Sequence, residues 1–269
     1  MPENEEKQSA GNIVLVTDGG SIPNPHEFRL INAWSLSLTL AVTSIFALCL
    51  IWPEPYLRIL LYLPDGILVT FQITLTSICF AVPLGFITGL GRISQNKVFK
   101  LIASTYVEII RGIPLLVQLF YIYYALSRFF QISGISSAVI AISVCYGAYM
   151  GEVFRAGIAA IPRGQTEAAR SLGFTRFQTM IYVILPQAMR TILPPVGNEC
   201  IAMLKDTALV SIMAVPDIMQ RARSFVGTPY LYFETYTVIA LVYLVITLLL
   251  SKAVSIMEGK LNYYDRKPR

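Results

Sequence analysis

The chain has 269 residues, of which 55% are hydrophobic and only 14% charged, and its mean hydropathy is +0.61. Soluble proteins carry about 25% charged residues, so this composition argues against a soluble enzyme and against a disordered chain. Its 21 Lys and Arg against 16 Asp and Glu give a net charge of +5, which would suit a nucleic-acid ligand only if the hydropathy were ignored. Where the charges lie decides between these interpretations.

Six apolar runs are long enough to cross a hydrocarbon core of ~30 Å. Four of them contain no Lys or Arg, and the other two, in the third and fifth places, carry a few embedded charges. In chain order the runs are 33–52, 66–91, about 106–126, 132–151, about 190–215 and 235–251. We therefore expect an all-α polytopic membrane protein with about six transmembrane helices.

The first run is bracketed by the two tryptophans of the sequence, Trp34 and Trp52. Their separation corresponds to about 27 Å of helix, and indole rings favour the headgroup zones of a bilayer. A cleaved signal peptide is the alternative, but this run is longer than an h-region and follows a polar tail that opens with acidic residues. We assign residues 1–30 to a polar tail and 31–54 to an N-terminal transmembrane helix.

The basic residues are distributed unequally between alternate loops. Fifteen of the 21 fall on the side of the N-terminus, four fall on the opposite side, and two lie at or within the runs. The positive-inside rule then places both termini in the cytoplasm, including a basic C-terminal tail at 256–269. The net positive charge is thus a signal of topology in a cell membrane.

The sequence carries no recognisable catalytic or metal-binding set. It has no GxxxxGK[ST] phosphate loop and no HExxH motif, its four cysteines form no CxxC pair, and its one histidine, His26, lies in the tail. We expect a protein that is not an enzyme and that binds no metal or cofactor. Work driven by nucleotide hydrolysis would have to come from another polypeptide.

The segment between the fourth and fifth runs, 151–190, predicts a helical hairpin on the cytoplasmic face. Pro162 introduces a run of good helix formers, and Gly173 can end that run in the left-handed conformation. Thr175 then begins a second helix, Gln178 completes a capping box, and Pro186 is expected to disrupt the helix. An amphipathic loop lying on the membrane is the alternative.

The first helix of this hairpin has the shape of a docking element. Its small Ala168 and Ala169 make it slim enough to enter a groove on another protein, while Glu167, Arg163 and Arg170 form a charged rim. A helix that docks needs a close fit in shape.

From Glu167 to Pro186 the sequence EAARSLGFTRFQTMIYVILP resembles the EAA loop of ABC-importer permeases. In that loop E-A-A, three residues, G, nine residues and I-x-L-P recur, and the spacing here holds within one residue. Three further stretches resemble the polar amino-acid subgroup, of the histidine, glutamine and arginine type. They are RGIPLLVQLFYIYY at 111–124, YGAYMGEVFRAGI at 146–158 and LKDTALVSIM at 204–213.

The resemblance covers about residues 66–255 and implies a type I permease domain of five core helices, to which the first helix would be an addition. It implies an inner-membrane subunit that translocates amino acids, polar or basic, through alternating access. The hairpin would dock on a separate ATPase that uses ATP, with Glu167, Ala168, Ala169, Gly173, Arg163 and Arg170 as the coupling residues. A second permease copy, identical or similar, two ATPase subunits and an extracytoplasmic amino-acid-binding protein would complete the complex.

Charged side chains inside transmembrane runs are costly, which makes them default candidates for a substrate path. In the third run we expect Glu108, Arg111 and Gln118 to lie close to one helical face, with Glu108 near enough to pair with Arg111. Pro114 should kink that helix and expose carbonyl groups. Pairing that merely fixes the helix packing is the alternative role for Glu108 and Arg111.

Glu152 lies directly after the fourth run, near the cytoplasmic end, and Arg155 follows it at i+3. The same alternative role applies to this pair. In the fifth run Glu199 and Asp206 share one face at i, i+7, with Lys205 beside them. A zwitterionic amino acid needs an acceptor for its ammonium group and donors for its carboxylate. Gln118, Glu199, Lys205 and Asp206 are therefore candidates for the wall of a substrate path, and mutual pairing is again the alternative.

Two glycine pairs, at 85 and 89 and at 147 and 151, have the small-xxx-small spacing that lets helices approach closely. Two other classes of protein remain as alternatives, a secondary transporter or channel and a membrane-embedded enzyme. The first has no reason to carry the hairpin, and the second would need a catalytic set, which is not apparent in the sequence. Within the importer hypothesis the solute could also be an opine or a quaternary amine.

Overall fold

The computed structural model of this chain describes residues 13–15, 21–23, 32–227 and 231–263. It comprises two units, Met1–Leu40 and Ala41–Arg269. In the first unit, strand β1 (Ile13–Leu15) pairs antiparallel with β2 (Ser21–Pro23). This short ribbon lies within the predicted polar tail, while His26 and the rest of that tail before residue 32 lie outside the described residues.

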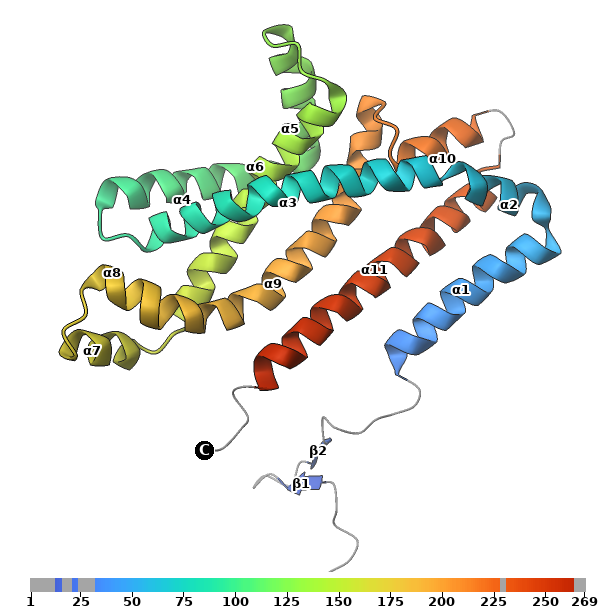
Figure 1. Cartoon of the computed structure of the whole chain (residues 1–269). Helices are drawn as coiled ribbons and strands as arrows, with labels where there is room; N and C mark the ends of the chain where they lie inside the picture. The colour runs from blue at the N-terminus through green and yellow to red at the C-terminus, as the bar shows by residue number, and fades with distance from the viewer. Residues whose placement is uncertain (1–12, 16–20, 24–31, 228–230, 264–269) are drawn as a thin grey trace, which may run out of the picture. The chain divides into compact units, whose positions relative to one another are not determined.

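Nearly all other described residues are helical, which confirms the all-α prediction (Figure 1). The α-helices are α1 (Ala33–Ile51), α2 (Pro53–Tyr62), α3 (Pro64–Ile93), α4 (Lys97–Gly112), α5 (Leu115–Phe120), α6 (Gly134–Ala159), α7 (Arg163–Ser171), α8 (Arg176–Gln178), α9 (Leu185–Asp206), α10 (Ile218–Val226) and α11 (Tyr232–Tyr263). Two π-helices, η1 (Tyr121–Ala125) and η3 (Thr179–Ile184), and two 3-10 helices, η2 (Leu126–Arg128) and η4 (Thr207–Met213), complete the described helices.

Four helical segments are long and apolar enough to cross a membrane by length and composition. They are Ala33–Ile51, Pro53–Ile93, Gly134–Ala159 and Tyr232–Leu261. Helices α4 and α5 with η1 pass the same test only as a pair that is bent by 99°, which brings the count to five. Helix α9 occupies the predicted fifth run, but its charged and polar side chains make it too polar to count among these apolar segments.

Two boundaries differ from the prediction. The fifth run does not continue as one helix to residue 215, because α9 ends at Asp206 and the tighter η4 follows it. Helix α11 runs to Tyr263, so the first half of the predicted C-terminal tail at 256–269 is a continuation of the helix. Residues 264–269 of that tail lie outside the described part of the chain.

Helices α3 and α6 form the tightest packed pair of the second unit. A Cβ atom added at Gly85 would lie 2.5 Å from Cβ of Met150, and one added at Gly89 would lie 2.6 Å from Cβ of Phe154. Side chains there would force the helices apart, so the predicted close approach at the glycines is confirmed. On α6, Gly147 and Gly151 likewise leave the space that side chains of α3 occupy.

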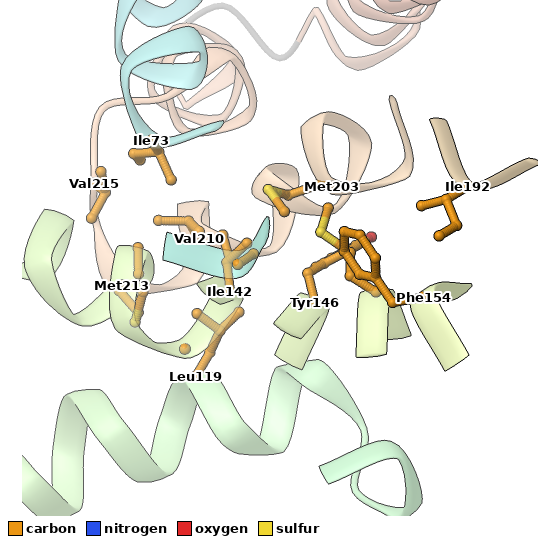
Figure 2. Close-up of a cluster of buried hydrophobic side chains, with 14 of the residues drawn as sticks. Ile73, Leu119, Ile142, Tyr146, Phe154, Ile192, Met203, Val210, Met213 and Val215 are labelled. Carbon is orange, nitrogen blue, oxygen red and sulfur yellow. The ribbon is translucent and has the colours of Figure 1, made fainter. Parts of the chain in front are cut away.

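The main core lies where α6 meets α3, α5, α9 and η4. Figure 2 shows its side chains converging, with Ile142 and Met203 fully buried. A smaller cluster joins α2, α10 and α11. The hairpin of α7 and α8 extends from one end of the bundle, and α2 and α10 lie at the other (Figure 1). We therefore look for functional side chains at the hairpin end of the bundle, at the end where α2 and α10 lie, and between the helices.

Candidate functional site

The hairpin has the local geometry that its sequence predicts. Helix α7 begins directly after Pro162 and ends at Ser171, and Gly173 adopts the left-handed conformation with φ +89°. The N–H of Gly173 donates to the carbonyl of Arg170 at 3.0 Å, and the N–H of Phe174 donates to that of Ala169 at 3.2 Å. A side chain at position 173 would be strained by this backbone, because only glycine adopts it without a Cβ clash.

The second arm begins with the predicted capping box. The N–H of Gln178 donates to Oγ1 of Thr175 at 3.2 Å, and the N–H of Thr175 donates to Oε1 of Gln178 at 2.8 Å. The prediction that Pro186 disrupts this arm was wrong. The π-helix η3 precedes the proline, Pro186 occupies the first turn of α9, where a missing N–H costs little, and the helical path continues to Asp206.

The outer face of the hairpin differs in one respect from the predicted docking element. Ala168 and Glu167 are exposed, but Ala169 is buried and faces the protein, so only one of the two alanines can meet a partner. Leu172 and Phe177 are 80% and 74% exposed. Large apolar side chains at a polar end of a bundle mark a contact surface. Sequence reasoning missed both, although each lies within four residues of Gly173.

One contact connects the hairpin to the bundle, and a second set joins two helices of the bundle to each other. Arg176 of α8 hydrogen-bonds Gln95 in the turn between α3 and α4. Glu152 of α6 accepts from Arg155, as its spacing predicts, and also from Arg92 at the end of α3. No spacing rule pairs Glu152 with Arg92, because the two residues are 60 positions apart in the sequence. Glu152 thus ties α3 and α6 together, and its place on a substrate path stays a prediction.

A polar cluster lies between α4, α6 and α9. The hydroxyl of Tyr146 donates to Oδ2 of Asp206 at 2.7 Å. Glu199, two turns earlier on α9, lies within electrostatic range of Asp206 and of Arg111 at the end of α4. The guanidinium of Arg111 also lies 5.0 Å from the ring centroid of Tyr149. The structure thus brings together Arg111, Glu199 and Asp206 of the predicted candidates and adds two tyrosines from the YGAYMGE stretch.

Other predicted candidates lie elsewhere. Glu108 and Lys205 are exposed, and no ion pair joins Glu108 to Arg111 within the described residues. The pairing expected at i, i+3 was therefore wrong, and Arg111 contacts Tyr149 instead. Gln118 does not share a helix with Glu108, because the predicted kink at Pro114 is a bend of 99°. Its side chain holds that bend by donating to the carbonyls of Ile110 and Ile113, each at 2.8 Å.

The cluster of Arg111, Tyr146, Glu199 and Asp206 has the charges that a zwitterion needs. Two carboxylates on one face of α9 can accept hydrogen bonds from an ammonium or guanidinium group, and Arg111 can donate to a carboxylate. Glu199 and Asp206 are both half-buried, and carboxylates that lose part of their water without a full set of partners are costly, so such a site gains from a cationic ligand. Within the described residues no group of three or more His, Cys, Asp and Glu could hold a metal ion.

At the opposite end of the bundle, Asp217 is a buried carboxylate outside the spanning helices. It caps α10 by accepting from the N–H groups of Gln220 at 2.9 Å and Met219 at 3.2 Å. Burial raises the pKa of Asp217 to about 6, although these hydrogen bonds and Arg223 act in the other direction. Ala214, just before it, has φ +55° and reverses the chain between η4 and α10.

A family profile described as "Binding-protein-dependent transport system inner membrane component" matches residues 81–263. The chain belongs to this family. It is therefore a multi-pass membrane permease component of a transport system, and not an enzyme. The hairpin and the polar cluster both lie within the matched region.

Curated relatives from this family match about three quarters of the chain. The L-cystine transport system permease protein TcyB of Bacillus subtilis (strain 168) is 39% identical over 208 residues, which are 76% of this chain and 88% of the relative. The arginine transport system permease protein ArtQ of the same organism is 35% identical, covering 76% and 94%. The glutamine transport system permease protein GlnP of Escherichia coli (strain K12) is 32% identical, covering 79% and 96%.

A crystal structure of an amino acid ABC transporter with histidines has a TM-score of 0.70 and 43% identity, covering 73% of this chain and 92% of that one. The MetNI methionine ABC transporter, at 21% identity and a TM-score of 0.64, shares the fold. About a quarter of this chain falls outside each of these matches. The domain boundaries assigned from the sequence, including the additional helix at 31–54, stay predictions.

Proposed function

We propose that this chain is the permease subunit of an ABC importer that moves amino acids, polar or basic, across the cell membrane. The observation that carries the proposal is the hairpin of α7 and α8, whose EAA sequence, glycine turn and exposed apolar side chains suit an ATPase partner. The names of the relatives, which carry cystine, arginine and glutamine, support an amino acid as the solute.

The coupling role rests on how the hairpin is exposed and held. Glu167, Ala168, Arg163 and Arg170 are exposed, so they are available to a groove on the ATPase. Arg170 also donates to the carbonyl of Phe174 at 2.7 Å, which braces the glycine turn. Because α7 packs on η3 and buries Ala169, a displacement of α7 moves the start of α9 with it. ATP is bound by the partner, and this chain contributes no cofactor site.

The substrate path runs past the polar cluster. Glu199 and Asp206 accept the positively charged group of the amino acid, and Arg111 with the hydroxyl of Tyr146 faces its carboxylate. Gln118 and Glu152 position helices around this path, while Glu108 and Lys205 lie outside the cluster. Because Asp206 is the last residue of α9 and Pro186 is in its first turn, the hairpin and the cluster lie at the two ends of one helix.

The remaining parts of the proposal concern assembly. One hairpin per chain requires a second permease copy, identical or similar, to engage two ATPase subunits. The distribution of Lys and Arg supports a cytoplasmic hairpin and cytoplasmic termini. An extracytoplasmic amino-acid-binding protein would then dock at the end of the bundle where α2 and α10 lie. Alternating access follows if closure of the ATPase dimer swings the hairpins and opens the path toward that protein.

Substitution at the glycine turn tests the coupling. Gly173→Val should leave the permease inserted and bound to its ATPase but should lower substrate-stimulated uptake in proteoliposomes, because a β-branched residue does not tolerate φ +89°. Gly164→Ala is the matched control, since nothing lies within 4 Å of the added Cβ. Unchanged uptake with Gly173→Val, or a solubilised chain that never copurifies with an ATPase, would contradict the proposal.

A further inference from the structure

A recess of the molecule lies away from the polar cluster, between the end of α3 and the start of α4. It is a groove of about 570 Å³ whose lining is almost entirely apolar. On α3 it is lined by Leu84, Ile87 and Leu90, and on α4 by Phe99, Ile102 and Ala103, among others. Ile87, Phe99 and Ile102 are each more than 60% exposed, so the groove opens to the surroundings of the bundle.

The groove has the length of one leaflet. Its lining along α3 and its C-cap extends from Leu84 to Ser94, a separation of ten residue steps that corresponds to ~15 Å of helix. One leaflet contributes half of a hydrocarbon core of ~30 Å. Ser94 lies at the end next to the turn between the two helices. Near the other end, the hydroxyl of Tyr106 donates to the carbonyl of Val144 at 2.6 Å, so its polarity is already satisfied. An acyl chain fits such a surface, and water does not.

The start of α4, next to the turn end of the groove, is basic, although its two lysines lie outside the groove's lining. Lys97 and Lys100 are exposed in the first turns of α4 and form no ion pair with any described carboxylate. Between Asp65 and Glu108 the sequence contains no Asp or Glu, so no acidic neighbour in this segment neutralises them. Arg92 lies close by in sequence, but Glu152 engages its guanidinium. The two lysines therefore offer charge to an anionic headgroup.

We propose that this groove binds one phospholipid with an anionic headgroup from the cytoplasmic leaflet, its acyl chain between α3 and α4 and its phosphate at Lys97 and Lys100. The choice of leaflet rests on the proposed function, which makes the hairpin end cytoplasmic. The turn that carries these lysines also holds Gln95, the partner of Arg176 in the hairpin. The headgroup thus lies beside the one contact described between this turn and the coupling element.

Native mass spectrometry of the full-length chain tests the site. The protein is released from micelles that contain equal amounts of phosphatidylglycerol and phosphatidylcholine with identical acyl chains. We expect one retained phosphatidylglycerol. A lysine near an anionic surface contributes about a fivefold preference, so the double variant Lys97→Gln, Lys100→Gln should lose about 25-fold in retention. Lys260→Gln, a basic residue of the last turn of α11, is the matched control and should retain the lipid.

A second variant addresses the acyl chain. Ala103→Phe fills the groove and should abolish retention of both lipids, and the two surface lysine substitutions carry the test if this core-facing change prevents folding. Equal retention of the two lipids by the wild-type chain, or full retention of phosphatidylglycerol by the double variant, would overturn the proposal. The measurement needs neither ATPase nor transport, so its failure is distinguishable from failure of the proposed function.

Discussion

The stability of the protein should depend on pH through Asp217. Its carboxylate is fully buried, and burial raises its pKa from an ordinary 3.8 to about 6. The folded state then holds the proton more tightly than the unfolded state, so stability falls as pH rises from about 4 to about 6. The full effect is about 3 kcal/mol, since each pKa unit corresponds to ~1.36 kcal/mol, and about 1.4 kcal/mol of it is gained between pH 8 and pH 5.

Asp217→Asn isolates this contribution. Asparagine keeps the cap on α10, because its side-chain oxygen can accept from the same N–H groups, but it carries no charge. We expect the variant to be more stable than the wild type at pH 8, with an advantage that shrinks by about 1.4 kcal/mol at pH 5. Asp217→Ala loses the cap as well and should forfeit about 1 kcal/mol of that gain at pH 8.

Thermal unfolding of the detergent-solubilised chain, followed from pH 5 to pH 8, measures the difference. Asp65→Asn is the control, because Asp65 is 73% exposed and its ion pair with Arg221 at 3.0 Å is a surface contact worth about 0–1 kcal/mol. The reasoning fails if the difference in Tm between Asp217→Asn and the wild type is the same at both ends of the pH range.

Other substitutions test the packing and the contacts. Gly89→Val should lower stability by about 1–3 kcal/mol or more in thermal unfolding, since the new side chain would overlap Phe154. Glu152→Gln should lower Tm because two arginines lose their carboxylate, and an unchanged Tm would count against a structural role. Thr175→Ala should cost the hairpin about 1 kcal/mol, visible as faster amide exchange at residues 176–178. Tyr146→Phe should weaken substrate-stimulated uptake severalfold without lowering expression, and unchanged uptake would remove it from the path.

Local signals made the hairpin predictable. A glycine that must take a positive φ and a capping box between residues three positions apart both depend on near neighbours in the sequence, and the structure has both, at Gly173 and Thr175. The spanning helices were predictable for a similar reason, because lipid selects for apolar runs of one length. The small-residue spacing on α3 and α6 likewise marked where two helices touch, although it did not identify the partner of each.

The polar contacts were less predictable because they join residues far apart in sequence. Arg92 and Glu152, and likewise Tyr146 and Asp206, are 60 residues apart, and no spacing rule pairs them. The expected pairing of Glu108 with Arg111 assumed that oppositely charged neighbours on one helical face form an ion pair. Arg111 instead contacts an aromatic ring on α6, because the break after Gly112 brings the end of α4 to that helix. Tertiary contacts therefore determine which partner a charged side chain such as Arg111 contacts.

Helices α6 and α9, which both contribute to the polar cluster, are held with unequal rigidity, and this indicates which of them moves. Helices α3 and α6 are locked by backbone contact at the glycines and by Glu152 at their shared end, so separating them would break both. Helix α9 has the hairpin at its start, a π-helix before its first turn, and two internal prolines at 194 and 195. Irregular helix geometry of this kind concentrates at hinges and functional sites. A force on α7 would therefore displace α9, with Glu199 and Asp206, against a fixed wall of α3 and α6, which is the relative motion that alternating access requires.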